Sequence, residues 1–299
     1  MTPDPDDRQR IAALLNVAGL GPAHAIVCLA GTGNRTFAVA GKGYDVVLRL
    51  PGRDTAALVD RAAEAHNAAT AASLGIAPGL LHLDPRDGAM VMARVAGRPI
   101  PPAAVTGRAD ALERLGRCLA RLHGGGTFAG RMDPWQKIAR YLAVAGLSGG
   151  DRSAFAGLWT AIEALRGRTQ LQESRLVPCH VDPIPANAID DGARVMLVDW
   201  EYAAMSDPHW DLAYVCVEGA LEPAEEAALL RGYGDRALSA GGLADWKCLA
   251  GVVSAAWCMA RAAADDAALW RDEIANRLAV LAPRLDDTAA AQGGQGAGR

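Results

Sequence analysis

The chain has 299 residues, of which 51% are hydrophobic and 21% charged. It is long and apolar enough to bury one large core or two lobes, and it is neither a disordered tail nor a small disulfide scaffold. Lys and Arg together number 30 against 34 Asp and Glu residues, a formal charge of -4. Such a chain lacks the strongly basic surface that binds a phosphate backbone, so we expect no nucleic-acid partner.

The sequence also favours one cellular compartment. Asp4, Asp6 and Asp7 stand where a signal peptide would have a basic start and an apolar stretch. The apolar run at residues 248–260 falls short of the roughly 20 residues that span a bilayer. The six cysteines are scattered, without a CxxC pair or a His/Cys cluster at zinc spacing. We therefore expect a cytoplasmic protein with reduced thiols and no membrane association.

The first part of the chain predicts a small antiparallel sheet. Apolar runs flank short glycine-containing turns, and one stretch with helical spacing stops at Gly75, with Pro78 beyond it. These patterns predict a helix over residues 54–74 and strands over residues 25–30, 36–40, 44–50, 80–83 and 89–95. We assign residues 1–95 to an N-terminal lobe.

The pattern after Gly97 is mainly helical, interrupted by one short hairpin over residues 188–198. Helices are predicted over residues 111–123, 135–145, 154–165, 223–233 and 243–264. We assign residues 96–285 to a larger helical lobe, and we expect residues 286–299, rich in Ala, Gly and Gln, to be a frayed tail. A ligand is expected between the two lobes, since a cleft at such a boundary is a common binding place.

Polar residues with a distinctive spacing surround the predicted hairpin. The segment before it has the pattern H-x-D-x-x-x-x-N, with His180, Asp182 and Asn187, and Asp199 follows the hairpin. A hairpin symmetric about residues 191 and 192 would bring Asp199 opposite Ile184. An Asn carbonyl and an Asp carboxylate suit a nucleotide-bound magnesium ion, and Asp182 would remain free to accept a hydroxyl proton.

This spacing matches the kinase catalytic loop and its metal-binding aspartate. Alternatively, Asp182 and Asp199 are only turn residues that cap a hairpin. His180 is expected to be a packed histidine rather than a base, because no second His or Cys stands at metal spacing. Asp211 is expected to be structural, with its carboxylate capping amides of the catalytic loop.

The segment DWEYAAMSDPHWDLA, residues 199–213, resembles the DWEY...DP..DLA signature of bacterial choline kinases. The chain is thus similar to the choline/ethanolamine kinase family, within the aminoglycoside phosphotransferase and protein-kinase-like group, from about residue 25 to residue 281. The resemblance implies a two-lobed protein-kinase-like α+β fold with a small antiparallel-sheet, nucleotide-binding lobe. It also implies transfer of the γ-phosphoryl group of ATP to the hydroxyl of choline or a close amino alcohol. By position, Asp182 would be the catalytic base, and Asn187 and Asp199 would hold Mg²⁺.

The resemblance implies nucleotide-binding roles in the N-terminal lobe as well. Gly33 and Asn34 would belong to a phosphate-binding turn, Arg49 would contact the α/β-phosphates, and Glu64 would be its helix partner. No lysine lies in a predicted strand of this lobe, so Arg49 is the strand cation available for phosphate. Two alternatives remain open, a tight turn without phosphate contacts and a solvated helical glutamate at position 64.

Aromatic residues gather in the later part of the chain, where an acceptor would bind. Aromatic faces beside a carboxylate recognise quaternary ammonium through cation-π and Coulomb attraction. By resemblance, Tyr202, Glu218 and Trp257 lie at the family's ammonium-binding positions. Alternatively, many of these aromatic residues pack between elements of the helical lobe.

Two departures from the family pattern leave the acceptor open. Ser254 stands where bacterial relatives carry a second tryptophan, and Pro183 follows Asp182 directly in a loop that lacks glycine. The rival acceptors are ethanolamine and an aminoglycoside, and the rival class is a catalytically silent pseudokinase that only binds nucleotide. Besides the small-molecule acceptor, a homodimer is left open as a partner.

Overall fold

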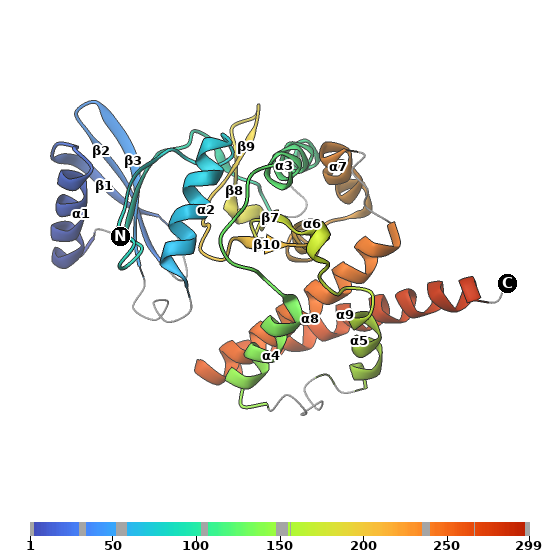
Figure 1. The fold of residues 1–299 in the computed structure, drawn as a ribbon. Coiled ribbons are helices and arrows are strands. Elements are labelled where there is room, and N and C mark those ends of the chain that lie inside the picture. The colour runs from blue at the N-terminus through green and yellow to red at the C-terminus, as the bar shows by residue number, and fades with distance from the viewer. Residues whose placement is uncertain are drawn as a thin grey trace.

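The computed structural model of the chain describes residues 3–29, 34–51, 59–102, 107–147, 155, 157–234, 240–265 and 267–296. Figure 1 shows two lobes, a sheet-rich lobe at the left and a larger helical lobe at the right. Each lobe has its own cluster of buried hydrophobic residues. The predicted α+β architecture with two lobes is therefore confirmed.

One antiparallel sheet of five strands forms the sheet-rich lobe. Its order is β1-β2-β3-β5-β4, and every neighbouring pair is antiparallel. The strands are β1 (Ala23–Leu29), β2 (Arg35–Gly41), β3 (Tyr44–Leu50), β4 (Leu80–Leu83) and β5 (Met90–Ala93). All five predicted strands are present, and the central position of β3 fixes Arg49 at the middle of the sheet.

Helix α1 (Pro5–Val17) covers this sheet and is absent from the predicted elements. Its Asp4 N-cap accepts a hydrogen bond from the Asp7 amide at 2.7 Å, and proline opens the helix, a combination that commonly starts helices. Apolar side chains of α1, including Ile11 and Leu15, join the buried cluster of the sheet. The acidic start of the chain is thus the first turn of a helix.

Helix α2 (Arg61–Ser73) lies beside the sheet and carries Glu64 in its first turn. Asp60 caps it by accepting hydrogen bonds from the amides of Ala62 and Ala63 at 3.1 and 3.0 Å. The helix ends before Gly75, whose φ of +70° is the left-handed conformation that favours glycine. The predicted helix starts earlier, at residue 54. That start is wrong for residues 59 and 60, which are not helical because Asp60 is the N-cap, and residues 52–58 lie outside the described residues.

The helical lobe contains the predicted helices and two more. Its helices are α3 (Arg108–His123), α4 (Pro134–Val144), α5 (Trp159–Arg166), α6 (Pro208–Glu218), α7 (Pro223–Tyr233), α8 (Ala240–Ala264) and α9 (Ala267–Gly296). Helices α6 and α9 were not predicted, and α9 includes residues 286–296, for which the sequence predicts a frayed tail. Within the described ranges, none of the helices combines the length and apolar character needed to cross a membrane.

Two small sheets lie where the lobes meet. One pairs β7 (Val177–Cys179) with β10 (Ala204–Ser206), and the other has the order β6 (Arg98–Pro99), β8 (Ala188–Asp190), β9 (Val195–Leu197). The predicted hairpin is confirmed as β8 and β9, but its predicted register is wrong. Ala188 pairs with Leu197, so Asp199 is level with residue 186 and not with Ile184. The Asp191 carboxylate accepts hydrogen bonds from the amides of residues 193 and 194, which centres the turn one residue later.

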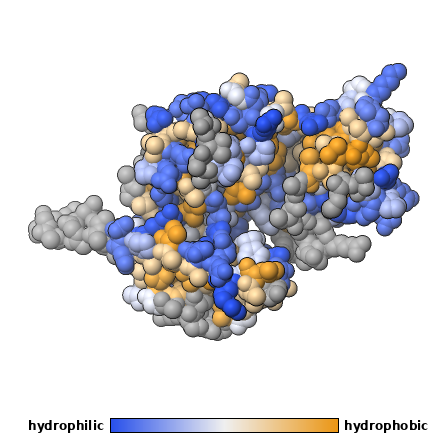
Figure 2. Space-filling view, turned by 180° about the vertical axis from the view of Figure 1, so that it is seen from behind, coloured by the Kyte–Doolittle hydropathy of each residue, from blue (hydrophilic) through white to orange (hydrophobic). Residues whose placement is uncertain are grey.

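The view from behind shows hydrophilic and hydrophobic residues mixed over both lobes, with a group of hydrophobic residues on the sheet-rich lobe (Figure 2). Exposed large hydrophobic side chains of that lobe include Val17, Val27, Leu29 and Leu81. Single exposed apolar residues of this kind are common on folded proteins and need no functional explanation.

Candidate active site

The loop after β7 carries Asp182 and is held in place by Asp211 of helix α6. The Asp211 carboxylate accepts hydrogen bonds from the amides of His180 and Val181 at 2.8 and 2.9 Å. His123 Nε2 lies 3.1 Å from the same carboxylate, and all these groups are buried. Val181 has a φ of +74°, an uncommon value for a β-branched residue. The predicted capping role of Asp211 is confirmed, and it holds the backbone next to Asp182 in a strained conformation.

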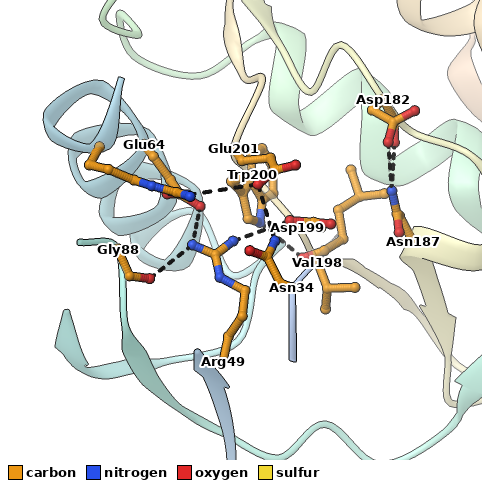
Figure 3. A network of polar contacts seen from close by, with 12 residues as sticks. Asn34, Arg49, Glu64, Gly88, Asp182, Asn187, Val198, Asp199, Trp200 and Glu201 are labelled. Carbon is orange, nitrogen blue, oxygen red and sulfur yellow. Dashed lines mark hydrogen bonds and ion pairs between the residues drawn. The ribbon is translucent and has the colours of Figure 1, made fainter. Parts of the chain in front are cut away.

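Asp182 and Asn187 are joined directly. The Asn187 amide nitrogen donates to the Asp182 backbone carbonyl at 3.0 Å and to its Oδ2 at 3.1 Å (Figure 3). Asn187 ends the short 3₁₀ turn η3 (Pro185–Asn187), and its backbone carbonyl accepts the Val198 amide at 2.9 Å. The prolines of the DPIPAN segment thus form a tight turn that brings Asn187 back onto Asp182.

His180 is a packed histidine, as predicted. Its Nε2 donates to the Val198 carbonyl at 3.0 Å, and its ring lies 4.5 Å from that of Trp200. Burial lowers the pKa of His180 to about 4, so the ring is neutral at pH 7. His180 therefore ties the loop of Asp182 to the strand end that carries Asp199.

Asp199 is the point where the two lobes meet. It has a φ of +67°, and its Oδ1 accepts a hydrogen bond from Arg49 Nη1 at 3.2 Å. Its side chain keeps 38% exposure, against 5% for that of Arg49. Burial of the carboxyl and the negative charge of Glu201 raise the pKa of Asp199 to about 6, while Arg49 opposes that rise. An added cation would relieve this crowding of negative charge.

Arg49 and Glu64 form the predicted pair. Arg49 Nη2 lies 2.5 Å from Glu64 Oε1, and both side chains are buried. Arg49 Nη2 also donates to the Gly88 carbonyl at 3.1 Å (Figure 3). Arg61 Nη1 lies 2.8 Å from Glu64 Oε2. The alternative of a solvated glutamate at position 64 is therefore wrong, because Glu64 is shared by two buried guanidinium groups.

Asn34 closes this network from the turn between β1 and β2. Its Nδ2 donates to Glu201 Oε2 at 3.1 Å, and Arg61 Nη1 lies 3.7 Å from that same oxygen. The turn predicted to bind phosphate is thus linked to the DWE segment, while Gly33 lies outside the described residues. We call the set Asn34, Arg49, Glu64, Asp199 and Glu201 the nucleotide side of the site, after the nucleotide-binding role that the resemblance implies for Asn34, Arg49 and Glu64.

A lysine that was not predicted to belong to the site lies close to Tyr202 and Asp182. Lys137 Nζ of helix α4 lies 4.9 Å from the centre of the Tyr202 ring and 6.0 Å from that of Tyr141. Burial raises the pKa of Asp182 to about 7, the positive charge of Lys137 opposes this, and the charge of Asp199 adds to it. Lys137 is thus near enough to Asp182 for the two charges to interact.

Glu218 is engaged by the protein itself. Arg277 of α9 forms a two-pronged ion pair with it, with N–O distances of 2.6 and 3.1 Å. Ser254 of α8 donates its hydroxyl to Glu218 Oε1 and is buried. Trp257, one turn further along α8, is 40% exposed and meets the Trp270 ring edge to face at 5.3 Å. We call Lys137, Tyr202, Glu218 and Trp257 the acceptor side, after the ammonium-binding role that the resemblance implies for Tyr202, Glu218 and Trp257.

Sequence reasoning missed several residues of the site. Arg61, Lys137 and Arg277 belong to no short motif, and only contacts between distant segments bring them in. Glu201 lies inside the DWEY segment and could have been found there. Lys137 had one available signal, because it is one of only three lysines in the chain.

Comparison with known proteins fits this geometry. A model of the phosphotransferase enzyme family matches residues 25–252. A choline/ethanolamine kinase family protein from Mesorhizobium loti is 28% identical, with a TM-score of 0.76, over 95% of this chain and 98% of the other. Choline kinase LicA from Streptococcus pneumoniae has the same fold, at 20% identity and a TM-score of 0.75, over 94% of this chain and 99% of the other.

Among curated proteins, the LicA protein of Haemophilus influenzae is 25% identical over 211 residues, or 69% of this chain. The match spans 61% of the length of that relative. These structural neighbours confirm the predicted protein-kinase-like fold. Since the family model covers most of the chain, and the residues it spans form a joined carboxylate, amide and guanidinium site, the chain belongs to the phosphotransferase enzyme family.

Proposed function

We propose that the protein is an ATP-dependent small-molecule kinase that transfers the γ-phosphoryl group to the hydroxyl of choline or a close amino alcohol. The observation that carries this proposal is the convergence of three side chains at the junction of the lobes. Asp182 and Asn187 are hydrogen-bonded to each other, and Asp199 is hydrogen-bonded to Arg49 of the sheet-rich lobe. Phosphoryl transfer depends mainly on positioning and on charge stabilisation, and these groups supply both.

Asp182 is the group proposed to orient the acceptor hydroxyl and accept its proton. Its Oδ2 is fixed by the Asn187 amide, and its backbone is fixed through Val181 by Asp211. Arg49, held by Glu64 and the Gly88 carbonyl, is proposed to position the phosphates. A guanidinium fixed in this way can bind phosphate oxygens with little loss of side-chain entropy.

Asn187 and Asp199 have the chemistry to hold magnesium. The Asn187 amide nitrogen is used on Asp182, and its Oδ1 accepts no hydrogen bond from the described residues. Asp199 is partly exposed and has a raised pKa, so a cation would stabilise its ionised form. One amide oxygen and one carboxylate, completed by water and phosphate oxygens, suit Mg²⁺, which would neutralise charge on the phosphates when bound.

Two lines of support favour a cationic amino alcohol as the acceptor. The relatives described above include a choline/ethanolamine kinase family protein and a choline kinase. Tyr202 and Trp257 are exposed by 37% and 40%, so neither aromatic residue is fully enclosed by the protein. Aromatic faces of this kind attract a quaternary ammonium group, which cannot donate a hydrogen bond.

The proposal is tested by ADP release with a panel of acceptors. The panel contains choline, ethanolamine, the methylated ethanolamines and an aminoglycoside, each with ATP and magnesium. The proposal expects the highest kcat/KM for choline or a methylated ethanolamine. Preference for the aminoglycoside would change the acceptor class. ATP binding without turnover of any acceptor would favour the pseudokinase.

A further inference from the structure

Lys137 lies on helix α4, which brings its ammonium group close to the ring of Tyr202. Helix α4 begins at the Asp133 N-cap, whose Oδ1 accepts the Trp135 amide at 2.9 Å. The buried residues of α4 include Ile138 and Leu142, which pack into the core of the helical lobe. Because that face is fixed, the helix cannot turn Lys137 away from Tyr202.

The ammonium group of Lys137 is held by aromatic rings and not by a carboxylate. Its Nζ lies 4.9 Å from the Tyr202 ring centre and 6.0 Å from that of Tyr141, within the range of a cation-π contact. Across the described part of the chain, no carboxylate oxygen lies within 4.0 Å of it. Lys247, by contrast, forms an ion pair with Glu226. Lys137 thus uses on Tyr202 the same interaction that a bound ammonium ligand would use.

The carboxylate of the acceptor side is also occupied by side chains of the protein itself. Glu218, the carboxylate expected to attract an ammonium ligand, is bound by both prongs of Arg277 and by the Ser254 hydroxyl. Its negative charge is therefore balanced within the protein. An entering cation would meet the positive charge of Lys137 at the Tyr202 ring, and a Glu218 carboxylate that is already paired with Arg277.

We propose that Lys137 is a specificity-determining residue that occupies the Tyr202 face and competes there with the ammonium group of a cationic acceptor. The inference rests on the proposed function, because it takes Tyr202 to be part of the acceptor's cation site. An amino alcohol must displace the Lys137 side chain from the ring or bind beside a like charge. Removing the ammonium group of Lys137 should therefore strengthen binding of a cation.

The test compares Lys137→Met with wild type, with Lys137→Arg as the matched variant that keeps a positive charge. The probe is tetramethylammonium, which carries the charge of choline without its hydroxyl, and its Kd is measured by isothermal titration. We expect Lys137→Met to lower this Kd by about two- to thirty-fold, the scale of one cation-π contact. Lys137→Arg should leave the Kd close to that of wild type.

A neutral compound shows whether tighter binding comes from removing the positive charge of Lys137 or from the space left by a smaller side chain. 3,3-Dimethyl-1-butanol has the shape of choline without its charge, so its Kd should change much less in Lys137→Met than that of tetramethylammonium. Should Lys137→Met fail to fold, Lys137→Gln replaces it with the same expected result. Equal tetramethylammonium affinity in wild type and the neutral variants, including no binding in either, would overturn the inference.

The acceptor panel separates this inference from the proposed function. If wild type phosphorylates choline while the neutral variants bind tetramethylammonium no more tightly, only the role of Lys137 is wrong. If the variants bind tetramethylammonium more tightly and no amino alcohol is phosphorylated, the proposed kinase activity is wrong while the competition at Tyr202 stands.

Discussion

On the nucleotide side, buried charges from the sheet-rich lobe are paired with one another, whereas on the acceptor side the ammonium group of Lys137 lies against aromatic rings. Arg49 and Arg61 share the buried carboxylate of Glu64 and reach Asp199 and Glu201 across the lobe boundary. Lys137 lies against aromatic rings and forms no ion pair with any described residue, and Tyr202 and Trp257 are more than one third exposed. The nucleotide side is therefore fixed before a ligand arrives, while the acceptor side can be changed with less effect on the fold.

The largest effect is expected where the two sides meet, at Asp182. Asp182→Asn removes the proton acceptor and keeps the shape of the side chain, so kcat should fall by about 10²- to 10⁴-fold. ATP affinity should stay within a few fold, because other groups bind the nucleotide. Steady-state kinetics and ATP titration measure both quantities. Asp191→Asn, in the exposed hairpin turn, is the matched control, and retention of most activity in Asp182→Asn would remove Asp182 from its role.

The next largest effect is expected when a proposed magnesium ligand is removed. Asn187→Ala removes one proposed oxygen ligand, so the magnesium concentration at half-maximal rate should rise about 100-fold. Magnesium titrations of the ADP-release rate measure this shift. A titration curve that coincides with that of wild type would show that Asn187 does not hold the metal.

Arg49→Ala tests whether the buried arginine of the nucleotide side binds the phosphates of ATP. Loss of a charge-assisted contact with the phosphates should raise the KM for ATP by about 10- to 100-fold. The acceptor KM should change much less, which would separate the two sides. Arg94→Ala removes an arginine from an exposed ion pair of the same lobe and serves as the control. Unchanged turnover at low ATP would mean that another cation binds the phosphates.

Trp257→Ala tests the adaptable acceptor side and should have a smaller effect. Loss of one aromatic face should lower kcat/KM for choline by about five- to thirty-fold, the equivalent of about 1 to 2 kcal/mol. Ethanolamine should lose less, because its ammonium group can still form hydrogen bonds. Equal losses for the two acceptors would argue that Trp257 only packs against Trp270.

The last effect concerns the stability of the fold and the buried His180. Its pKa is lowered from 6.5 to about 4 in the folded protein, so the folded state resists protonation that the unfolded chain accepts. His180 should therefore reduce the free energy of unfolding as the pH falls below about 6.5, by up to about 2 kcal/mol at pH 5. Urea unfolding of wild type and His180→Gln at pH 7 and pH 5 measures this. The variant should lose less stability between the two pH values, and an equal loss would contradict the assignment.

The residues that could be predicted are those held in short segments. His180, Asp182 and Asn187 lie within eight residues of one another, and the DWEY segment follows a single hairpin, so local spacing together with the family resemblance predicted that they lie in one site. The Arg49–Glu64 pair could be predicted because a strand and the next helix bring the two residues together.

The acceptor side could not be predicted in this way, because Lys137, Glu218 and Arg277 meet only through the packing of α4, α6 and α9. Ser254 illustrates the consequence. From the sequence, Ser254→Trp is expected to be neutral or to improve choline binding by adding an aromatic wall. The structure gives Ser254 a buried position and a hydrogen bond to Glu218, so we now expect the larger side chain to disturb α8 and to weaken choline binding.

Phosphorus-31 NMR of the complete reaction tests the central claim most directly. Wild-type protein is incubated with ATP, magnesium and choline, beside Asp182→Asn under the same conditions. The account predicts a new phosphomonoester signal, matching phosphocholine, that grows together with ADP in wild type and is almost absent in the variant. Formation of inorganic phosphate alone, or equal formation of the ester by both proteins, would contradict it.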